Sequence, residues 1–141
     1  MRRFIWIIMA TIMITSCHHA TLEDRAAKMA ADYTERYCPT PPENYVVTDS
    51  VTFDRDTKTF NYYYRFTDKA DNIETINKSK KLLDKELTEG LRENTTMKVY
   101  KEASYNFNYV FRSNKTGNIL YSKHLSAKDY NVKQSQKRQR R

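Results

Sequence analysis

The sequence predicts an α+β fold in which two αββ units form an antiparallel four-stranded sheet with two helices packed on one face. Two observations support this prediction. Apolar residues recur at helical spacing in two separate segments, and each segment is followed by two runs in which apolar and polar residues alternate. The order is therefore helix, hairpin, helix, hairpin, and we expect these elements to form a single domain of residues 21–130.

The first predicted helix begins at Thr21. The Thr21 hydroxyl can cap the helix, and Asp24, three residues later, suits the partner position of a capping box. The apolar residues at helical spacing form one stripe: Leu22, Ala26, Met29, Ala30, Tyr33 and Tyr37. Because proline cannot continue a helix, the three prolines Pro39, Pro41 and Pro42 should end it.

The first predicted hairpin follows these prolines. Four apolar residues on one parity indicate its first strand: Tyr45, Val47, Val51 and Phe53. Residues 54–58 are polar and suit a turn, which makes the two strands antiparallel neighbours. The second strand has its own alternating set: Phe60, Tyr62, Tyr64 and Phe66.

The second predicted helix begins at Asp71, where Glu74 repeats the capping-box spacing. Its apolar residues at helical spacing are Ile73, Ile76, Leu83, Leu87 and Leu91. The helix should end between Gly90 and Asn94. Residues 95–102 are ambiguous between a loop and a short extra helical turn.

The second predicted hairpin covers residues 105–125. The first strand of this hairpin, the third of the sheet, is indicated by alternating aromatic residues: Tyr105, Phe107, Tyr109 and Phe111. Residues 114–117 suit a turn in which Gly117 takes a left-handed conformation. The fourth strand is indicated by Ile119, Tyr121 and Leu125.

Residues 1–16 have the composition of a signal peptide. Arg2 and Arg3 precede eleven apolar or near-apolar residues, whereas a helix needs about 20 to span a bilayer. The end of this segment, Ile14-Thr15-Ser16-Cys17, resembles the lipobox of bacterial lipoproteins. The resemblance implies that Cys17 is acylated, becomes the first residue of the mature chain, and is joined to the domain by residues 18–20.

Two alternatives to a lipobox are less favourable. An ordinary secretory cleavage site needs small residues at positions −3 and −1, and His18-His19-Ala20 would place a bulky imidazole at −3. A membrane helix continuing past Cys17 would bring histidines and acidic residues into the hydrocarbon region. We therefore expect a membrane partner through two or three acyl chains, which hold a protein on the membrane far longer than one chain does.

The residues after Cys17 indicate, by resemblance alone, which membrane of the cell envelope would hold the protein. Many enteric lipoproteins retained at the inner membrane have Asp at the next position, where this chain has His18. Surface-exposed lipoproteins of Bacteroidetes often have an acidic cluster there, which this chain lacks. The resemblance therefore implies an outer-membrane protein that faces the periplasm.

The formal net charge of +8 is concentrated at the two ends of the chain. Two positive charges belong to the predicted signal peptide, and five lie in the last eleven residues: Lys133, Lys137, Arg138, Arg140 and Arg141. Residues 17–130 then carry +1, so no basic face indicates a nucleic-acid partner. Residues 131–141 are expected to be a disordered tail, either solvated or in contact with anionic lipid, lipopolysaccharide or an acidic partner.

The sequence contains no motif that indicates catalysis. There is no GxSxG, no HExxH and, with only two glycines, no phosphate-binding glycine loop. Asp54-x-Asp56 resembles the start of a calcium loop but has Thr59 and Arg65 where an EF-hand needs Gly and Glu. We expect no enzyme activity, no cofactor and no metal. Cys38 is expected to be a buried free thiol, with a disulfide-linked dimer or a redox role as the alternatives.

The candidate binding surface is the sheet face opposite the packed aromatics. Its predicted residues, which we call the polar sheet face, are Asn61, Tyr63, Arg65, Asn106, Asn108, Arg112 and His124. Aromatic rings with amides and guanidinium groups are typical of surfaces that bind proteins or sugars, although the same composition suits an ordinary solvated sheet. The leading hypothesis is a lipid-anchored periplasmic module that binds a protein, as an inhibitor or immunity factor. The alternatives are an envelope glycan binder and an enzyme with an unrecognised site.

Two wider resemblances remain at the level of structure. The lipobox, residues 60–66 and residues 100–113 resemble small uncharacterised lipoproteins of Bacteroidetes, over most of the mature chain. The repeated αββ order resembles that of PepSY-type domains and of β-lactamase-inhibitor-type proteins. Neither resemblance implies an activity, and only the role of Cys17 is carried over.

Overall fold

The structure, a computed structural model, describes residues 19–131. The predicted signal peptide, Cys17 and residues 132–141 of the tail lie outside the described residues. The described elements are α1 (Leu22–Tyr37), β1 (Val46–Asp54), β2 (Thr59–Phe66), a 3-10 turn η1 (Asp68–Ala70), α2 (Ile73–Glu93), α3 (Lys98–Glu102), β3 (Asn106–Ser113), β4 (Ile119–Leu125) and α4 (Ala127–Tyr130). The α+β class is confirmed.

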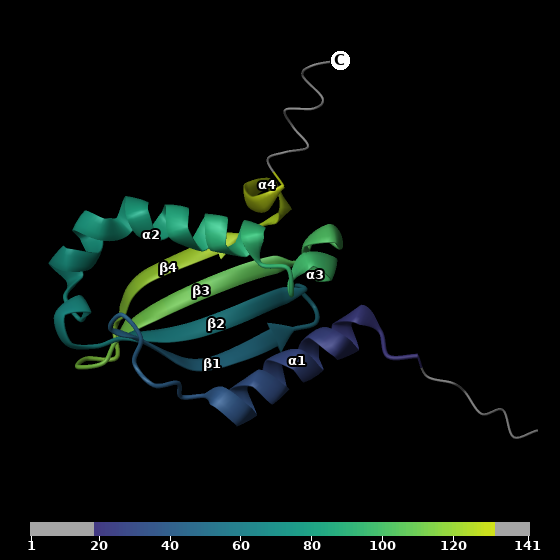
Figure 1. The fold of residues 1–141 in the computed structure, drawn as a ribbon, viewed down its shortest axis with the longest axis horizontal. Helices are drawn as coiled ribbons and strands as arrows, with labels where there is room; N and C mark the ends of the chain where they lie inside the picture. The colour runs from purple at the N-terminus through teal and green to yellow at the C-terminus, as the bar shows by residue number, and fades with distance from the viewer. Residues whose placement is uncertain (1–18, 132–141) are drawn as a thin grey trace, which may run out of the picture.

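The sheet is mixed, which corrects the prediction of a purely antiparallel sheet. The strand order is β1-β2-β3-β4, with two antiparallel hairpins joined by a parallel pair of β2 and β3. The reason is the long connection between these strands. It contains α2, which runs back along the sheet, so that β3 starts at the same end as β2 (Figure 1). The order αββαββ is present, but nothing else confirms two equivalent units.

Strand β1 departs from the predicted alternation because of a β-bulge between Thr48 and Ser50. Val46 pairs with Phe66 and Val51 pairs with Tyr62, both on the face that carries the helices. A single extra residue reverses the parity of everything beyond it. Val47 therefore lies on the opposite face from Val51, contrary to the prediction. Val47 is nevertheless buried on that face, with 4% of its surface exposed.

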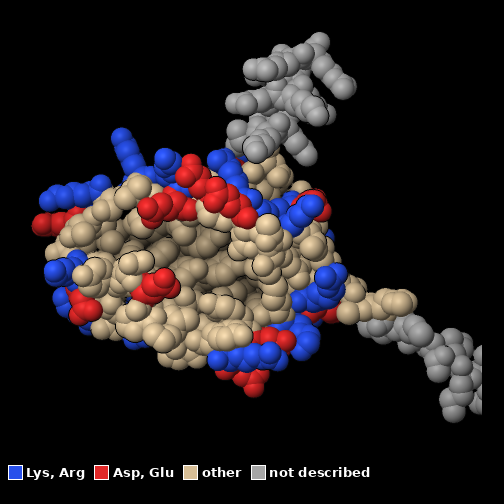
Figure 2. Space-filling model, viewed as in Figure 1, with Lys and Arg blue, Asp and Glu red and all other residues tan. Residues whose placement is uncertain are grey.

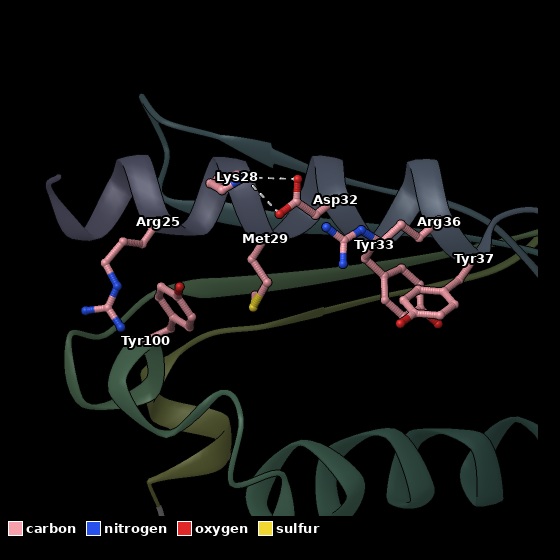
Figure 3. Close-up of a pocket in the computed structure, with 8 residues that line it drawn as sticks. All are labelled: Arg25, Lys28, Met29, Asp32, Tyr33, Arg36, Tyr37 and Tyr100. Atoms are coloured by element: carbon pink, nitrogen blue, oxygen red, sulfur yellow. Dashed lines mark hydrogen bonds and ion pairs between the residues drawn. The ribbon is translucent and has the colours of Figure 1, made fainter.

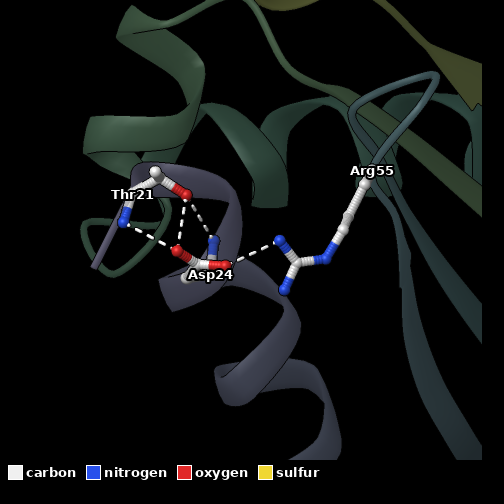
Figure 4. Close-up of polar contacts among 3 residues, drawn as sticks. All are labelled: Thr21, Asp24 and Arg55. Carbon is white, nitrogen blue, oxygen red and sulfur yellow. Dashed lines mark hydrogen bonds and ion pairs between the residues drawn. The ribbon is translucent and has the colours of Figure 1, made fainter. Parts of the chain in front are cut away.

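The start of α1 confirms the predicted capping box. The Thr21 hydroxyl accepts a hydrogen bond from the Asp24 amide at 3.1 Å, and the Asp24 carboxylate accepts one from the Thr21 amide at 2.9 Å. The Asp24 carboxylate also forms an ion pair with Arg55 of the β1–β2 turn, at 2.7 Å (Figure 4). This ion pair with Arg55, aided by the hydrogen bonds from Thr21, lowers the pKa of Asp24 to about 2. The capping box thus also joins the first turn of α1 to the sheet.

The start of α2 differs from the prediction. Asn72 is the cap, and its side chain accepts hydrogen bonds from the amides of Glu74 and Thr75. Asp71 is instead buried and accepts a hydrogen bond from the Lys115 amide at 2.9 Å. A hydrogen bond with the Ser113 hydroxyl is the main reason that the pKa of Asp71 is lowered. Asp71 thus fixes the β3–β4 turn, in which Gly117 has the predicted positive φ of 72°.

The segment that was ambiguous in sequence contains α3, which closes the end of α2. Lys101 donates to three carbonyl oxygens in this region: Leu91 at 2.6 Å, Arg92 at 2.7 Å and Asn94 at 2.8 Å. The last carbonyls of a helix have no partner within the helix and carry partial negative charge. The ammonium group of Lys101 therefore stabilises the end of α2 and holds α3 beside it.

The core lies between the sheet and the helices and is largely aromatic. Its fully buried large side chains are Phe60, Tyr105, Phe107 and Leu125. From α1, Ala26 and Ala30 contribute the buried positions, which lets the helix lie close to β1. Helix α2 packs mainly on β4. The two long helices thus lie along opposite margins of one sheet face (Figure 1).

Candidate functional site

A groove runs between α1 and α2 over the centre of the sheet. Figure 2 shows the face hollowed there, with uncharged residues forming most of the hollow and charged side chains gathered mainly around it. We call this feature the α1–α2 groove. It exists because α1 packs along β1 and α2 packs along β4, which leaves the Tyr62 and Tyr64 rings of β2 only partly covered.

Tyr62 and Tyr64 of β2 form the partly exposed floor of the groove, and the buried ring of Tyr109 on β3 supports them from the side. Tyr62 stacks on Tyr109 with ring centroids 5.1 Å apart, and on Tyr64 at 6.3 Å. Tyr64 also stacks on Phe111 at 4.6 Å. Parallel pairing of β2 with β3 places Tyr62 directly beside Tyr109, since these residues are register partners. The floor is therefore a rigid aromatic surface made by two strands.

The hydroxyl groups of these tyrosines give the floor a polar component. The Tyr62 hydroxyl donates to the Met97 sulfur at 3.9 Å, a weak acceptor. No described residue accepts a hydrogen bond from the hydroxyl of Tyr64 or Tyr109. Burial raises the pKa of all three phenols well above the ordinary value. A tyrosine is protonated at neutral pH even at its ordinary pKa of about 10, so the hydroxyls of Tyr62 and Tyr64 can donate hydrogen bonds to a bound molecule.

Tyr33 of α1 lines three adjoining hollows of this region. The hollow above Tyr62 has a volume of about 330 Å³ and includes Met29, Val51 and Met97. A second hollow of about 550 Å³ reaches Tyr64 and the proline segment. A third of about 440 Å³ runs along α1 (Figure 3). With 39% of its surface exposed, Tyr33 is the side chain that a ligand in any of them would meet.

Cationic side chains stand along the α1 side of the groove. Arg25, Lys28 and Arg36 line the hollow shown in Figure 3, where the one acidic residue is Asp32. Asp32 is paired with Lys28 at 3.0 Å. No described carboxylate lies within ion-pair distance of Arg25 or Arg36. These guanidinium groups are therefore available to an acidic ligand.

Helix α2, the opposite wall, is attached to β4 through Asp84. The Tyr121 hydroxyl donates to the Asp84 carboxylate at 2.5 Å, and Lys123 lies 3.2 Å from the same oxygen. The hydrogen bond from Tyr121 is the main cause that lowers the pKa of Asp84. These contacts fix the position of α2 and therefore the width of the groove.

The structure brings the predicted residues of the polar sheet face together on β2, β3 and β4. Asn108 donates to Asn61 at 3.1 Å, and His124 is the register partner of Asn108. Arg65 contacts Asp49 at 3.0 Å, and the Tyr63 ring is half-buried. Asn106 donates to the carbonyl of Thr57, and Arg112 to that of Gly117, both at 3.1 Å. Many of these polar groups thus bond within the protein, and binding by this face stays a prediction.

The groove was not predicted from the sequence, which assigned its tyrosines to a packed face. A signal for it is nevertheless present in the order of phenylalanine and tyrosine. Phe60 and Phe66 at the ends of β2 are buried, whereas Tyr62 and Tyr64 between them are only partly buried. A tyrosine hydroxyl needs a partner or water, so tyrosines at the centre of a sheet indicate incomplete cover there.

Other kinds of site find little support among residues 19–131. No group of three or more His, Cys, Asp or Glu side chains in this range could hold a metal ion. No helix within this range is long and apolar enough to cross a membrane. Cys38 is a partly buried free thiol, and burial, followed by the charge of Asp49, raises its pKa.

Comparisons with known proteins give a family match and three similar folds. The profile of the family described as "Domain of unknown function (DUF8479)" matches residues 21–121. No curated protein sequence matches the chain. A "putative secreted protein" from Pseudomonas aeruginosa has a similar structure, with a TM-score of 0.62 and 14% identity over 79% of this chain and 99% of that one.

Two pilotins of type 2 secretion systems also share the fold. EpsS from Vibrio vulnificus has a TM-score of 0.59 and 11% identity, over 77% of this chain and 90% of its own. AspS from Vibrio cholerae has a TM-score of 0.55 and 10% identity, over 76% and 90%. At these identities the likeness concerns the fold alone. The comparisons add no support for a Bacteroidetes origin or for PepSY-type repeats.

Proposed function

We propose that this chain, which belongs to the DUF8479 family, is a non-catalytic lipoprotein of the cell envelope that binds a segment of a partner protein in the α1–α2 groove. The observation that carries the proposal is the groove between the two helices, at whose floor the Tyr62 and Tyr64 rings are partly exposed. Monomeric proteins seldom expose a concave apolar surface that has no ligand. The floor is also rigid, so binding needs little reorganisation of the protein.

The fold neighbours support an envelope role. Two of the three belong to type 2 secretion systems and the third is described as secreted. A lipid on Cys17 would agree with this location, and an outer-membrane position facing the periplasm remains our proposal. Inhibitor or immunity activity is one form that such binding could take.

The groove also defines the chemistry of the partner. Apolar side chains of the segment would occupy the hollows beside Tyr62 and Tyr64, where tyrosine rings combine with methionine, valine and proline side chains. Acidic side chains would lie toward α1, where Arg25 and Arg36 have no described ion-pair partner. The partner segment is therefore apolar on one side and acidic beside α1. An envelope glycan on the polar sheet face is the alternative ligand.

Site-specific photo-crosslinking in cells tests this proposal. A photoreactive phenylalanine analogue replaces Tyr33 in the groove, Tyr63 on the polar sheet face, or Tyr45, which is 46% exposed and lines none of the three hollows. We expect one protein to be captured from position 33 alone. Mass spectrometry of the adduct then identifies the captured segment.

Affinity measurements complete the test. A synthetic peptide of the captured segment should bind the purified protein, and Tyr33→Ala should weaken binding at least about tenfold, as expected for an aromatic anchor. Tyr45→Ala should change it less than twofold. Charge reversal at Arg25 and Arg36 should weaken binding mainly at low salt. Capture from position 63 with none from position 33 would contradict the groove proposal and favour the polar sheet face.

A further inference from the structure

The two outer edges of the sheet differ in how they are covered. The strand order leaves one side of β1 and one side of β4 without a neighbouring strand. On β1, the side chains of Thr34 and Thr40 bond to backbone groups of that side. On β4, the backbone of Ile119–Leu125 bonds to no part of the described residues other than β3. We call this side the β4 edge, and every second residue of the strand turns its N–H and C=O groups toward it.

The features that usually protect an edge strand leave most of the β4 edge open. Lysine side chains and β-bulges are common protections, and β4 has one of each. The Lys123 ammonium, however, is held on the helix side of the sheet, 3.2 Å from the Asp84 carboxylate. The bulge lies opposite the step from Phe111 to Arg112, at the start of β4, and pairing is regular over Tyr121–Leu125. This regular stretch can accept a further strand.

A hollow of about 410 Å³ lies between α2 and β4, beside the β4 edge. It is lined by a side of α2 other than the one whose leucines pack on the core. The charged residues that line it are Lys81, Asp84, Lys85, Glu89 and Arg92 of α2 and Lys123 of β4. Asp84 is already paired with Lys123, and no described carboxylate lies within ion-pair distance of Lys81 or Lys85. The hollow therefore has a net positive charge with two lysines available to an acidic ligand.

A strand added to the β4 edge would run along this hollow. Neighbouring strands lie about 4.8 Å apart, and the side chains of a strand alternate between the two faces of the sheet. Tyr121 and Lys123 of β4 point to the helix side, where both contact Asp84 of α2. Residues of an added strand that lie beside these two would also point to that side and meet the hollow. The alternate residues would lie beside the exposed Ser122 and His124.

We propose that the β4 edge binds an extended segment of a partner protein by strand addition, with acidic side chains of that segment in the hollow between α2 and β4. Main-chain hydrogen bonds supply the affinity in this mode of recognition, and the side-chain contacts supply the specificity. The site is separate from the α1–α2 groove and would receive a different segment.

The charge of the hollow argues against two other occupants. A second copy of the chain, paired about a two-fold axis, would bring the lysines of both hollows toward one another. Residues 131–141 of this chain have five basic residues and no acidic residue, so they would also meet like charge. An acidic segment of another protein is the occupant that complements Lys81 and Lys85.

A peptide of defined composition tests the proposal. The protein is the chain from residue 17 to Arg141 with Cys17→Ser, which contains the whole described fold. The probe is an end-capped peptide of alternating glutamate and valine, as long as the seven residues of β4, and the reference peptide has lysine in place of glutamate. In NMR titrations, the glutamate peptide should slow hydrogen exchange of alternate amides in Tyr121–Leu125. The lysine peptide should bind at least about tenfold more weakly. Absence of this protection, or equal binding of the two peptides, would overturn the proposal.

Main-chain pairing has a signature that a purely ionic contact lacks. Two further glutamate peptides are N-methylated, one at the odd and the other at the even positions. Only alternate amides of a paired strand donate to its neighbour, so one methylated peptide should lose binding and the other should keep it. Equal effects of the two methylation patterns would contradict strand addition.

Paired variants locate the peptide on the protein. Lys81→Glu with Lys85→Glu should weaken binding of the glutamate peptide at least about tenfold. The control of equal net charge is Lys69→Glu with Lys98→Glu, at two exposed positions that do not line the hollow, and it should stay within about twofold. Tyr33→Ala should also leave binding unchanged. Loss in Tyr33→Ala with none in the Lys81 and Lys85 variant would place the peptide in the α1–α2 groove and overturn the proposal.

The exchange rates of the free protein test the other two occupants. The outward amides of Tyr121–Leu125 should exchange rapidly at all protein concentrations when no peptide is present. Protection that rises with protein concentration would assign the β4 edge to a second copy. Protection that is independent of concentration would assign it to a segment of the same chain. Either result would overturn the proposal without affecting that for the α1–α2 groove.

Discussion

The hydroxyl of Thr34 on α1 makes two hydrogen bonds with the backbone of Val51 on β1. It donates to the Val51 carbonyl and accepts from the Val51 amide, both at 2.7 Å. A second threonine continues this arrangement, since Thr40 binds the backbone of Thr48 through its amide and its hydroxyl, each at 3.0 Å. The outer edge of β1, which would otherwise present unpaired backbone groups, is thus closed by α1 and the segment after it.

Replacing Thr34 by Val should destabilise the protein. Valine has nearly the same shape but leaves the amide and carbonyl of Val51 without their partner, in a partly buried position. We expect a loss of about 1–3 kcal/mol in the free energy of unfolding, measured by urea denaturation. The matched control is Thr52→Val in the same strand, where the side chain is exposed. An equal loss in both variants would show that the two hydrogen bonds are not the cause.

The two glycines of the chain should respond in opposite directions to alanine. Gly117 has a φ of 72°, so Gly117→Ala should cost about 1 kcal/mol through backbone strain, although no atom lies within 4 Å of the added methyl group. Gly90 lies inside α2 with the same free space, so Gly90→Ala should stabilise by about 0.5–1 kcal/mol. Thermal and urea unfolding check both values. Destabilisation of both variants would contradict the backbone argument.

Local patterns predicted the elements of the fold, because each depends on neighbouring residues. The Thr21–Asp24 capping box and the turn at Gly117 were both confirmed. The features that failed depend on distant partners. Asp71 was expected to cap α2. Its carboxylate instead accepts a hydrogen bond from the Lys115 amide in the β3–β4 turn, 44 residues away in sequence. Parallel pairing of β2 with β3 likewise depends on the path of α2, which no local pattern records.

The candidate site was less predictable than the fold. Alternation correctly placed Tyr62, Tyr64 and Tyr109 on the face that carries the helices. It could not show that α1 and α2 would pack on β1 and β4 and leave the Tyr62 and Tyr64 rings as a partly exposed floor. The lateral position of a helix on a sheet depends on contacts such as those of Ala26 and Asp84, which only the assembled fold reveals.

The ion pair between Asp24 and Arg55 should make stability sensitive to strong acid. The folded-state pKa of Asp24 is about 2, below the ordinary value of about 3.9 expected in the unfolded chain. Its stabilising contribution is therefore complete above about pH 4 and is lost as the pH falls towards 2. Carbon-detected NMR titration of the Asp24 carboxyl group measures the folded-state pKa directly.

A pair of variants identifies the cause of this low pKa. Arg55→Gln should raise the pKa of Asp24 but not fully restore it, because the hydrogen bonds from Thr21 remain. Lys58→Gln is the control, since Lys58 pairs with Glu23 in the same turn and not with Asp24. If both substitutions shift the pKa of Asp24 equally, the general charge of the turn and not the contact with Arg55 would be responsible.

The hydrogen bond from Tyr121 to Asp84 should determine how firmly α2 forms the groove wall. Tyr121→Phe keeps the buried ring but removes the donor, and Lys123 remains as the other partner of Asp84. We expect a loss of about 1 kcal/mol, at the low end for a bond to a charged group because Asp84 is partly exposed. Hydrogen exchange of the α2 amides around Asp84 should quicken, whereas Tyr45→Phe at an exposed site should change neither quantity.

The pH dependence of the Tyr121→Phe effect distinguishes this bond from simple packing. The same hydrogen bond lowers the folded-state pKa of Asp84, so its contribution is present above the ordinary carboxyl pKa of about 3.9 and is lost as the pH falls through the lower folded-state value. The difference in unfolding free energy between the variant and the parent should therefore shrink in acid. A difference that stays constant from pH 7 to pH 2 would mean that the hydroxyl acts through packing, and that α2 is held to β4 by its apolar contacts.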